Sequence, residues 1–291
     1  MTLGEMYAIA AAATWAMSSV LVRTQTDRVG VLVINFVRCL AAELALVALL
    51  PLVGTLGMFA ELPWRSVGFL VVAMILGLIL GDSLFFKSLG LIGVARATPI
   101  TNTAPLFTFG LSLIFLQEAL TWGIFVGSLL VVSGVTLIAV SRERPGEVGW
   151  GRVRWTGIAL AIGASMCWAV GTLVLKVAVA DLNPYAAHVL RLAVAVLVLG
   201  VLSGRELPRL GQYGVQSVGM MALAGVVGIG GSGFLYLSAV KYAGAARTAS
   251  LAGTMPLFAA LLSWWVLREQ ITWRVIMGSV VTVIGIWLIV A

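Results

Sequence analysis

The feature that most constrains this sequence is a series of apolar stretches that recur along its whole length, separated by short polar connections. A helix needs about 20 apolar residues to cross the hydrocarbon core of a bilayer. Stretches of this kind occupy residues 5–22, 31–50, 67–87, 93–116, 121–140, 157–176, 184–203, 215–238, 245–267 and 272–290. The sequence therefore predicts an all-α membrane protein with ten transmembrane helices.

Composition agrees with a membrane protein and argues against other classes. Of the 291 residues, 61% are hydrophobic and 10% are charged, whereas soluble domains carry about 25% charged residues. A soluble fold of this length could not bury so much apolar surface. The net charge of +7 does not indicate nucleic-acid binding, because the basic residues are spread along the chain at the ends of apolar runs. Cys39, Cys167 and the single histidine have no metal-binding spacing, so we expect no metal and no cofactor.

The basic residues predict which helix ends face the cytoplasm. Twelve of the 18 Lys and Arg residues border loops that follow odd-numbered segments, four border the other loops, and Arg38 and Arg191 lie inside segments. Because cytoplasmic loops carry the excess of positive charge, we expect the odd loops in the cytoplasm and both termini in the periplasm. Residues 142–155 form the predicted basic cytoplasmic linker.

An internal repeat divides the chain into two sets of five segments. Residues 77–140 overlay on 228–291 without a gap, and the informative matches are Arg96 with Arg247, Pro105-Leu106-Phe107 with Pro256-Leu257-Phe258, Glu118 with Glu269, Thr121-Trp122 with Thr272-Trp273, and Gly134 with Gly285. A two-residue shift in register also pairs Trp15 with Trp168 and Arg38 with Arg191. Because each set has an odd number of segments, residues 1–141 and 156–291 are predicted to be two inverted five-helix repeats.

Inverted repeats are typical of secondary transporters, because two similar halves that exchange conformations give inward-open and outward-open states of similar energy. The duplicated pattern of Pro-Leu-Phe, Glu, Thr-Trp and the glycine pairs Gly127/Gly134 and Gly278/Gly285 resembles the paired EamA units of the drug/metabolite transporter superfamily. The resemblance implies ten helices, a central cavity and export of a small metabolite without ATP. Within the superfamily, the chain looks most similar to the YddG-like bacterial amino-acid exporters.

These features together predict a secondary transporter, not an enzyme, that exports small metabolites across a bacterial inner membrane by alternating access. Amino acids, aromatic ones among them, are the expected substrates, and the expected partners are this small molecule and the lipid bilayer. No nucleic-acid partner and no catalytic residue are expected. The fused duplicate predicts a monomer. An exporter of drugs or quaternary cations is the alternative, and a lipid-modifying membrane enzyme is less favoured because no paired acids lie within one turn inside a span.

The fourth segment carries a polar face that is a candidate substrate site. Thr98, Thr101 and Asn102 share one helical face with Pro105. Because polar groups at membrane depth face the bundle interior, these side chains either bind a substrate amine or carboxylate or join neighbouring helices.

Aromatic residues inside spans are further candidates, because most membrane tryptophans lie at the interface instead. Trp15 and Ser19 share a face of the first segment, and Trp168 repeats that face in the sixth. Phe85 in the third segment and Tyr236 in the eighth are also candidates for substrate binding. These side chains either wall a substrate pocket or pack in the core.

Charged residues inside spans complete the candidates. Glu43 and Asp82 have no matched acid in the other half; each could bind a substrate ammonium or carry a proton, and Asp82 could instead pair with Lys87 or Arg96. Arg38 and Arg191 either extend to the headgroups or act as gate residues near opposite membrane faces, and His188, which shares a helical face with Arg191, would make such a gate sensitive to pH. Glu118 and Glu269 are expected to fix helix hairpins, next to the helix N-caps Thr121 and Thr272.

Overall fold

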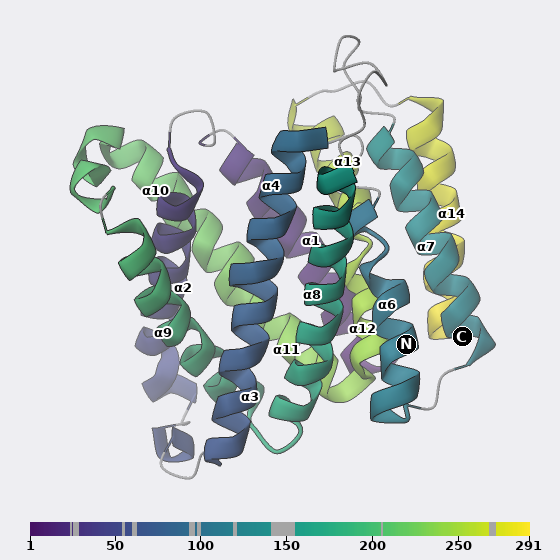
Figure 1. Cartoon of the computed structure of the whole chain (residues 1–291), viewed down its shortest axis with the longest axis horizontal. Coiled ribbons are helices and arrows are strands. Elements are labelled where there is room, and N and C mark those ends of the chain that lie inside the picture. The colour runs from purple at the N-terminus through teal and green to yellow at the C-terminus, as the bar shows by residue number, and fades with distance from the viewer. Residues whose placement is uncertain are drawn as a thin grey trace.

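The computed structural model describes residues 1–23, 25, 29–53, 56–59, 63–92, 97, 100–118, 121–140, 155–204, 206–267 and 272–291. Within these parts of the chain, every regular element is a helix (Figure 1). In chain order the helices are α1 (Leu3–Arg23), α2 (Val31–Val53), η1 (Leu56–Phe59), α3 (Trp64–Met74), η2 (Ile75–Gly81), α4 (Asp82–Ile92), α6 (Ala104–Leu111), η3 (Ser112–Leu116), α7 (Trp122–Val140), α8 (Trp155–Val179), α9 (Pro184–Ser203), η5 (Leu207–Tyr213), α10 (Gly214–Gly225), η6 (Val226–Gly231), α11 (Ser232–Ala243), α12 (Ala245–Ala252), α13 (Met255–Leu267) and α14 (Trp273–Val290).

The described helices include six that are long and apolar enough to cross a membrane: Leu32–Val53, Trp64–Phe85, Trp155–Val179, Pro184–Ser203, Leu210–Ala243 and Trp273–Val290. Two shorter apolar helices cover Ala104–Leu116 and Trp122–Ile138. Large apolar side chains lie fully open on their outer surfaces, with Leu52 82% and Val201 83% exposed. Such a surface is stable only against an apolar environment, so the predicted all-α membrane class is confirmed.

The fourth and ninth predicted segments are interrupted at equivalent points, where continuous helices were expected. Thr103 donates its hydroxyl to the Ile100 carbonyl at 2.6 Å, and Thr254 donates to Leu251 at the same distance. Pro105 follows the first interruption, and its repeat equivalent Pro256 follows the second. Because proline has no N–H, neither can donate to the carbonyl four residues earlier. The threonine turns are the local alternative to a regular helix.

The last helices of the two repeats, α7 and α14, pack along a seam of four glycines. A Cβ atom at Gly127 would lie 2.7 Å from the Gly285 carbonyl oxygen, and one at Gly134 would lie 2.5 Å from that of Gly278. The absence of side chains therefore lets the two backbones touch. Because residue numbers rise along one helix as they fall along the other, the two helices are antiparallel.

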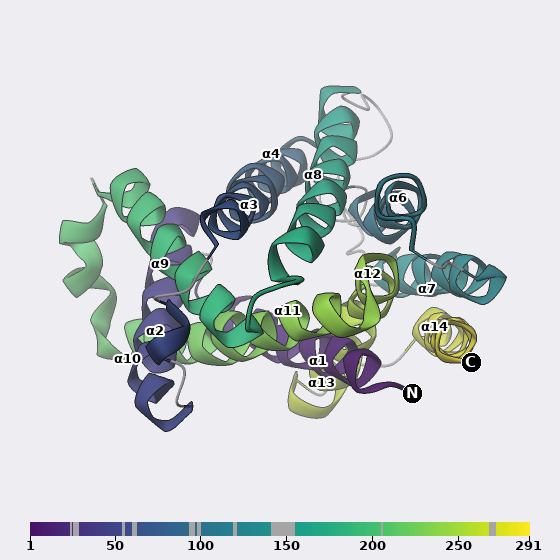
Figure 2. The same ribbon diagram turned by 90° about the horizontal axis from the view of Figure 1, so that it is seen from below.

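Other helix contacts occur in pairs related by the repeat. Helix α1 packs against α10 and α11, and its counterpart α8 packs against α3 and α4; α2 packs against its own counterpart α9. Viewed from one end, α1, α2, α3, α8, α9 and α11 surround the middle of the molecule, whereas α7 and α14 lie together at one edge (Figure 2). Residues on the inner helices are therefore the ones that meet at the centre.

Candidate functional site

Two aromatic pairs, each formed by one residue from each repeat, lie where the inner helices meet. Trp15 of α1 packs on Tyr236 of α11 with ring centroids 5.1 Å apart, and Trp168 of α8 packs on Phe85 of α4 at 5.5 Å. Trp15 is the repeat equivalent of Trp168, and Phe85 is the equivalent of Tyr236. All four side chains keep accessible surface. The structure thus brings these four predicted site residues into two equivalent contacts.

The two aromatic contacts are connected through one turn of α8. The hydroxyl groups of Tyr236 and Thr172 lie 2.9 Å apart and share a hydrogen bond. Thr172 also donates to the carbonyl of Trp168, one turn earlier, at 2.9 Å. Helices α1, α8 and α11 therefore meet at this point, and Thr172 is a neighbour of the predicted site residues.

Asp82 lies beside Trp168 at the centre of this arrangement. The Trp168 indole Nε1 donates to Asp82 Oδ1 at 3.0 Å and also lies 3.2 Å from the Gly77 carbonyl oxygen. A Cβ atom at Gly81 would lie 2.6 Å from the Trp168 ring, so the glycine makes room for the indole. The predicted pairing of Asp82 with Lys87 is wrong, because the carboxylate turns inward to Trp168; Arg96 lies outside the described residues.

Asp82 directly follows η2, a π-helical segment that shifts the register of side chains around the helix. The equivalent part of the second repeat contains a second π-helical segment, η6. Segments of this kind are frequent at functional sites. The position that corresponds to Asp82 is Gly233, so the two repeats share the backbone feature but only one carries a carboxylate.

Arg38 is held on the inner side of α2 by neutral partners. Its Nη1 donates to Asn35 Oδ1 at 3.1 Å and its Nη2 donates to Ser18 Oγ at 3.2 Å. Ser18 in turn donates to the Ala224 carbonyl at 2.8 Å. Extension of this guanidinium to the lipid headgroups, one of the two predicted alternatives, is therefore wrong for Arg38.

Arg191 lies at the equivalent position of α9, and both arginines are within electrostatic range of Asp82. Their placement near opposite membrane faces stays a prediction. Their role as gates stays a prediction.

His188 is 2% exposed and packs against α11. Its Nε2 lies 2.9 Å from the Ile229 carbonyl oxygen, and its Nδ1 is buried without a hydrogen-bond partner among the described residues. The ring is in contact with Gly233, whose missing side chain leaves space for it. The repeat equivalent of His188 is Asn35, the partner of Arg38. A pH-sensitive gate at His188 also stays a prediction.

The polar face of the fourth segment lies against α8. Thr101 donates its hydroxyl to the Ala97 carbonyl at 3.1 Å, and Ser165 of α8 lies 3.2 and 3.3 Å from the carbonyls of Ile100 and Thr101. Asn102 lies in the interruption of the helix, with its Nδ2 buried and without a hydrogen-bond partner among the described residues. The carbonyls at this interruption thus join two helices, while the amide nitrogen of Asn102 is left available.

The remaining predicted residues differ in how well they are placed. Glu43 of α2 is partly buried, and its Oε2 is buried without a hydrogen-bond partner in the described part of the chain. Thr98 and the side chain of Ser19 lie outside what the structure describes. Nowhere in the described residues do three His, Cys, Asp or Glu side chains form a group that could hold a metal ion.

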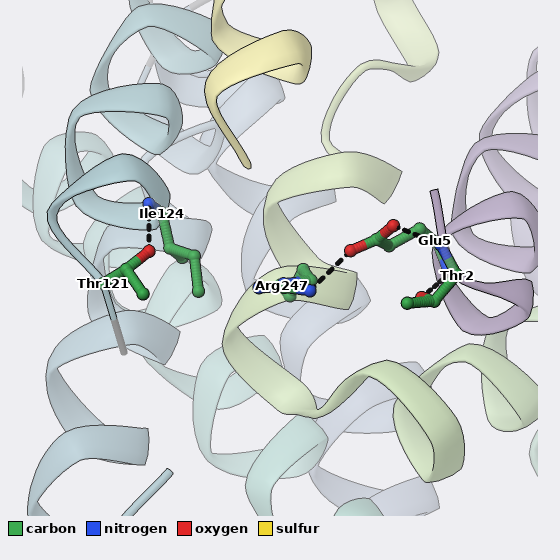
Figure 3. Close-up of polar contacts among 5 residues, drawn as sticks. All are labelled: Thr2, Glu5, Thr121, Ile124 and Arg247. Carbon is green, nitrogen blue, oxygen red and sulfur yellow. Dashed lines mark hydrogen bonds and ion pairs between the residues drawn. The ribbon is translucent and has the colours of Figure 1, made fainter. Parts of the chain in front are cut away.

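Two contacts at the end of the bundle that carries both termini were not predicted. Glu5 of α1, which is 1% exposed, accepts a hydrogen bond of 2.5 Å from Nη1 of Arg247 in α12 (Figure 3). The same carboxylate caps α1 by accepting from the Thr2 backbone N–H at 2.6 Å. The sequence Thr2-x-x-Glu5 is a capping-box signal and could have indicated the cap, but no local signal pointed to Arg247.

Glu118 was expected to fix its own hairpin, but it caps a helix of the other repeat. Its two carboxylate oxygens accept from the backbone N–H groups of Ala245 and Ala246, at 2.8 and 3.3 Å, at the start of α12. Gly244 permits this approach, since it has a φ of +87° and a Cβ there would lie 2.8 Å from the carboxylate. The matched Glu269 lies outside the described residues.

The predicted N-caps at Thr121 and Thr272 are confirmed. Thr121 Oγ1 accepts from the Ile124 N–H at 3.3 Å, and Thr272 Oγ1 accepts from the Val275 N–H at 3.4 Å. Figure 3 shows the first of these caps.

A helical membrane protein whose two repeats meet at a polar centre has the architecture of a membrane solute transporter. The chain belongs to the EamA-like transporter family, whose model matches residues 2–140 and again residues 155–291. A protein of Archaeoglobus fulgidus described as an "Uncharacterized transporter" is 26% identical over 288 residues, which cover 98% of this chain and 96% of that protein. A solved structure described as "Crystal structure of protein" has a TM-score of 0.83 at 16% identity and covers 98% of this chain and 94% of that chain, so the fold is shared.

Proposed function

We propose that this protein is a ten-helix secondary transporter that exports amino acids, aromatic ones among them, across a bacterial inner membrane. The observation that carries the proposal is the pair of repeat-related aromatic contacts, in one of which Trp168 is hydrogen-bonded to Asp82. An aromatic amino acid offers an ammonium group for the carboxylate and a ring for the aromatic walls. Accessible surface on Trp15, Trp168 and Asp82 supports a centre that is open to a small molecule.

Alternating access is the proposed mechanism. Each half supplies one tryptophan, one arginine and one aromatic residue of the α4 or α11 position to the centre. If the two halves exchange conformations, the same residues face first one compartment and then the other. The broken fourth and ninth segments and the π-helical segments η2 and η6 provide places where the backbone can change without breaking long helices.

An exporter of quaternary cations is the second candidate. Asp82 and Glu43 are the central acids, Oε2 of Glu43 lacks a hydrogen-bond partner among the described residues, and the tryptophan rings could stack on a cation. This candidate predicts that a permanent cation without a carboxylate competes for the same site.

Transport into proteoliposomes tests the proposal. Uptake of tritiated L-phenylalanine is measured with wild-type protein, with and without an imposed pH gradient, and in the presence of unlabelled tetraphenylphosphonium. We expect saturable uptake, reduced several-fold by Asn102→Ala and Glu43→Gln. Uptake of tetraphenylphosphonium but not of phenylalanine would favour the second candidate, and absence of uptake for both would contradict a transporter of either kind.

We also propose that both termini are periplasmic and that the protein is a monomer, since the two fused repeats supply each other's contacts. Thr2→Cys and Ala291→Cys, each in a background without Cys39 and Cys167, test the orientation with a membrane-impermeant maleimide. Both positions should react in intact spheroplasts. Reaction only after lysis would reverse the topology.

A further inference from the structure

Two arginines at repeat-related positions lie at membrane depth. Arg38 and Arg191 are equally far from the starts of α2 and α9, which places each roughly 10 Å inside its helix. Both keep accessible surface, and α2 packs directly against α9. The two helices are antiparallel, since Tyr185 near the start of α9 donates to the Leu46 carbonyl of α2 and a Cβ at Gly200 would lie 3.3 Å from the Phe36 ring. Arg191 therefore lies about one helical turn from the level of Arg38.

The arginines of this region have no direct acidic partner in the described part of the chain. Asp82 is within electrostatic range of both arginines, but its hydrogen bond goes to Trp168. Arg38 is bonded to the neutral Asn35 and Ser18, and its Nε is buried without a partner in the described part of the chain. Arg191 makes no hydrogen bond or ion pair with another described residue. The second central acid, Glu43, lies five residues after Arg38 on α2, and its Oε2 is also buried without a hydrogen-bond partner in the described part of the chain. Neither guanidinium therefore contacts a carboxylate directly among the described residues.

An unpaired cation at membrane depth is costly unless an anion reaches it. A guanidinium binds a carboxylate through two parallel hydrogen bonds, a geometry that an ammonium or an amide cannot match. We infer that Arg38 and Arg191 bind the carboxylate of the substrate, while Asp82 binds its ammonium group. This inference rests on the proposed function and names the substrate class of that site: a zwitterionic α-amino acid, not a cation.

The difference between the repeats supports a fixed orientation of such a substrate. The position equivalent to Asp82 is Gly233, and the ring of His188 occupies the space beside it. The position equivalent to Asp82 in the second repeat therefore has no carboxylate. The ammonium group binds on the α4 side, next to Trp168, and the carboxylate binds between α2 and α9.

Competition binding tests the inference with three compounds that differ in one group each. Tritiated L-phenylalanine is bound to purified wild-type protein and displaced by unlabelled L-phenylalanine, by L-phenylalaninamide, which lacks the carboxylate, and by 3-phenylpropanoate, which lacks the ammonium group. We expect phenylalanine to bind most tightly. Arg191→Gln should weaken the binding of phenylalanine and of 3-phenylpropanoate by roughly tenfold. The affinity for phenylalaninamide should stay unchanged. Arg38→Gln should act in the same direction.

Asp82→Asn should give the opposite pattern. It should weaken the binding of phenylalanine and of phenylalaninamide, while 3-phenylpropanoate should bind as well as before or more tightly. Arg274→Gln is the matched control, since Arg274 is exposed at the start of α14 and should change none of the three affinities. If Arg191→Gln does not fold, Arg191→Lys keeps the charge and loses the bidentate geometry, so it should show a smaller loss of the same two ligands.

The outcomes separate the inference from the proposed function. Wild-type protein that binds phenylalanine, with equal affinities for the arginine variants and the control, overturns the inference alone. Wild-type protein that binds tetraphenylphosphonium but none of the three phenyl compounds overturns the inference and the amino-acid substrate together. A loss of phenylalaninamide binding in Arg191→Gln equal to that of phenylalanine also overturns the inference, because the arginine would then act only through the structure.

Discussion

Replacing Gly134 by alanine tests whether the α7–α14 seam holds the two repeats together. The added Cβ would lie 2.5 Å from the Gly278 carbonyl oxygen and would also contact Thr282. Because a relaxed C···O contact is about 3.3 Å or longer, the helices must separate by roughly 0.8 Å. Overpacking of this kind costs about 1–3 kcal/mol, and the better helix propensity of alanine returns up to about 1 kcal/mol. We expect a net loss of about 1–2 kcal/mol.

The free energy of unfolding can be measured by titrating the purified protein with SDS in mixed micelles and following fluorescence of its 10 tryptophans. Gly278→Ala should cost about as much as Gly134→Ala, since its Cβ would lie 2.6 Å from the Gly134 carbonyl oxygen. The double variant should cost less than the sum of the two, because one separation of the helices accommodates both methyl groups. Ligand affinity should not change, since the seam lies at the edge of the bundle (Figure 2).

Gly68→Ala and Gly219→Ala are the matched controls. These glycines also occupy equivalent positions in the two repeats, and a Cβ at either would meet nothing within 4 Å. They should leave stability unchanged or raise it by up to about 1 kcal/mol. If Gly134→Ala is as stable as these controls, the seam is not close-packed and our reasoning about it is refuted.

Three further predictions concern individual polar contacts. Glu118→Ala should lower the free energy of unfolding by about 1–2 kcal/mol, and Glu118→Gln should lower it less. Hydrogen exchange at the Ala245 and Ala246 amides should become faster. Unchanged exchange would exclude the cap. A double-mutant cycle of Glu5→Gln and Arg247→Gln should give a coupling of about 1 kcal/mol, since Arg247 is 28% exposed; strict additivity would mean that the ion pair contributes nothing. Trp168→Phe removes the hydrogen bond to Asp82 and should lower the free energy of unfolding by about 1.5–3 kcal/mol. Trp15→Phe should lower it less, because the ring nitrogen of Trp15 has no hydrogen bond to a described residue. Equal losses in the two unfolding titrations would contradict this assignment.

Sequence reasoning succeeded where the signal is local or duplicated. Apolar length predicted the membrane class, and the threonines before Trp122 and Trp273 predicted helix caps that the structure confirms. The duplicated glycines Gly127 and Gly134 matched Gly278 and Gly285, which the structure joins in one seam. A feature retained in both repeats was therefore a reliable guide to a contact.

Sequence reasoning failed where the contact partner of a side chain is distant in the sequence. One alternative paired Asp82 with Lys87 or Arg96, which are close in sequence, but its hydrogen-bond partner Trp168 lies 86 residues away. Glu118 reaches a helix 127 residues later. The interrupted helices were also missed, although Pro105 and Pro256 were visible, because a proline in a long apolar run can kink a helix instead of breaking it. These contacts and interruptions depend on which helices pack together, and the spacing of apolar residues along the sequence does not contain that information.

The reciprocal glycine contacts have a consequence for how the molecule could be assembled. The glycine face of α7 contacts the equivalent glycine face of α14, which is the self-complementary arrangement of a two-fold symmetric dimer. The polypeptide thus resembles a pair of subunits tied end to end. If residues 1–140 and 155–291 were produced from separate genes in one cell, the two fragments should find each other in the bilayer and co-purify, with Gly134→Leu abolishing their association.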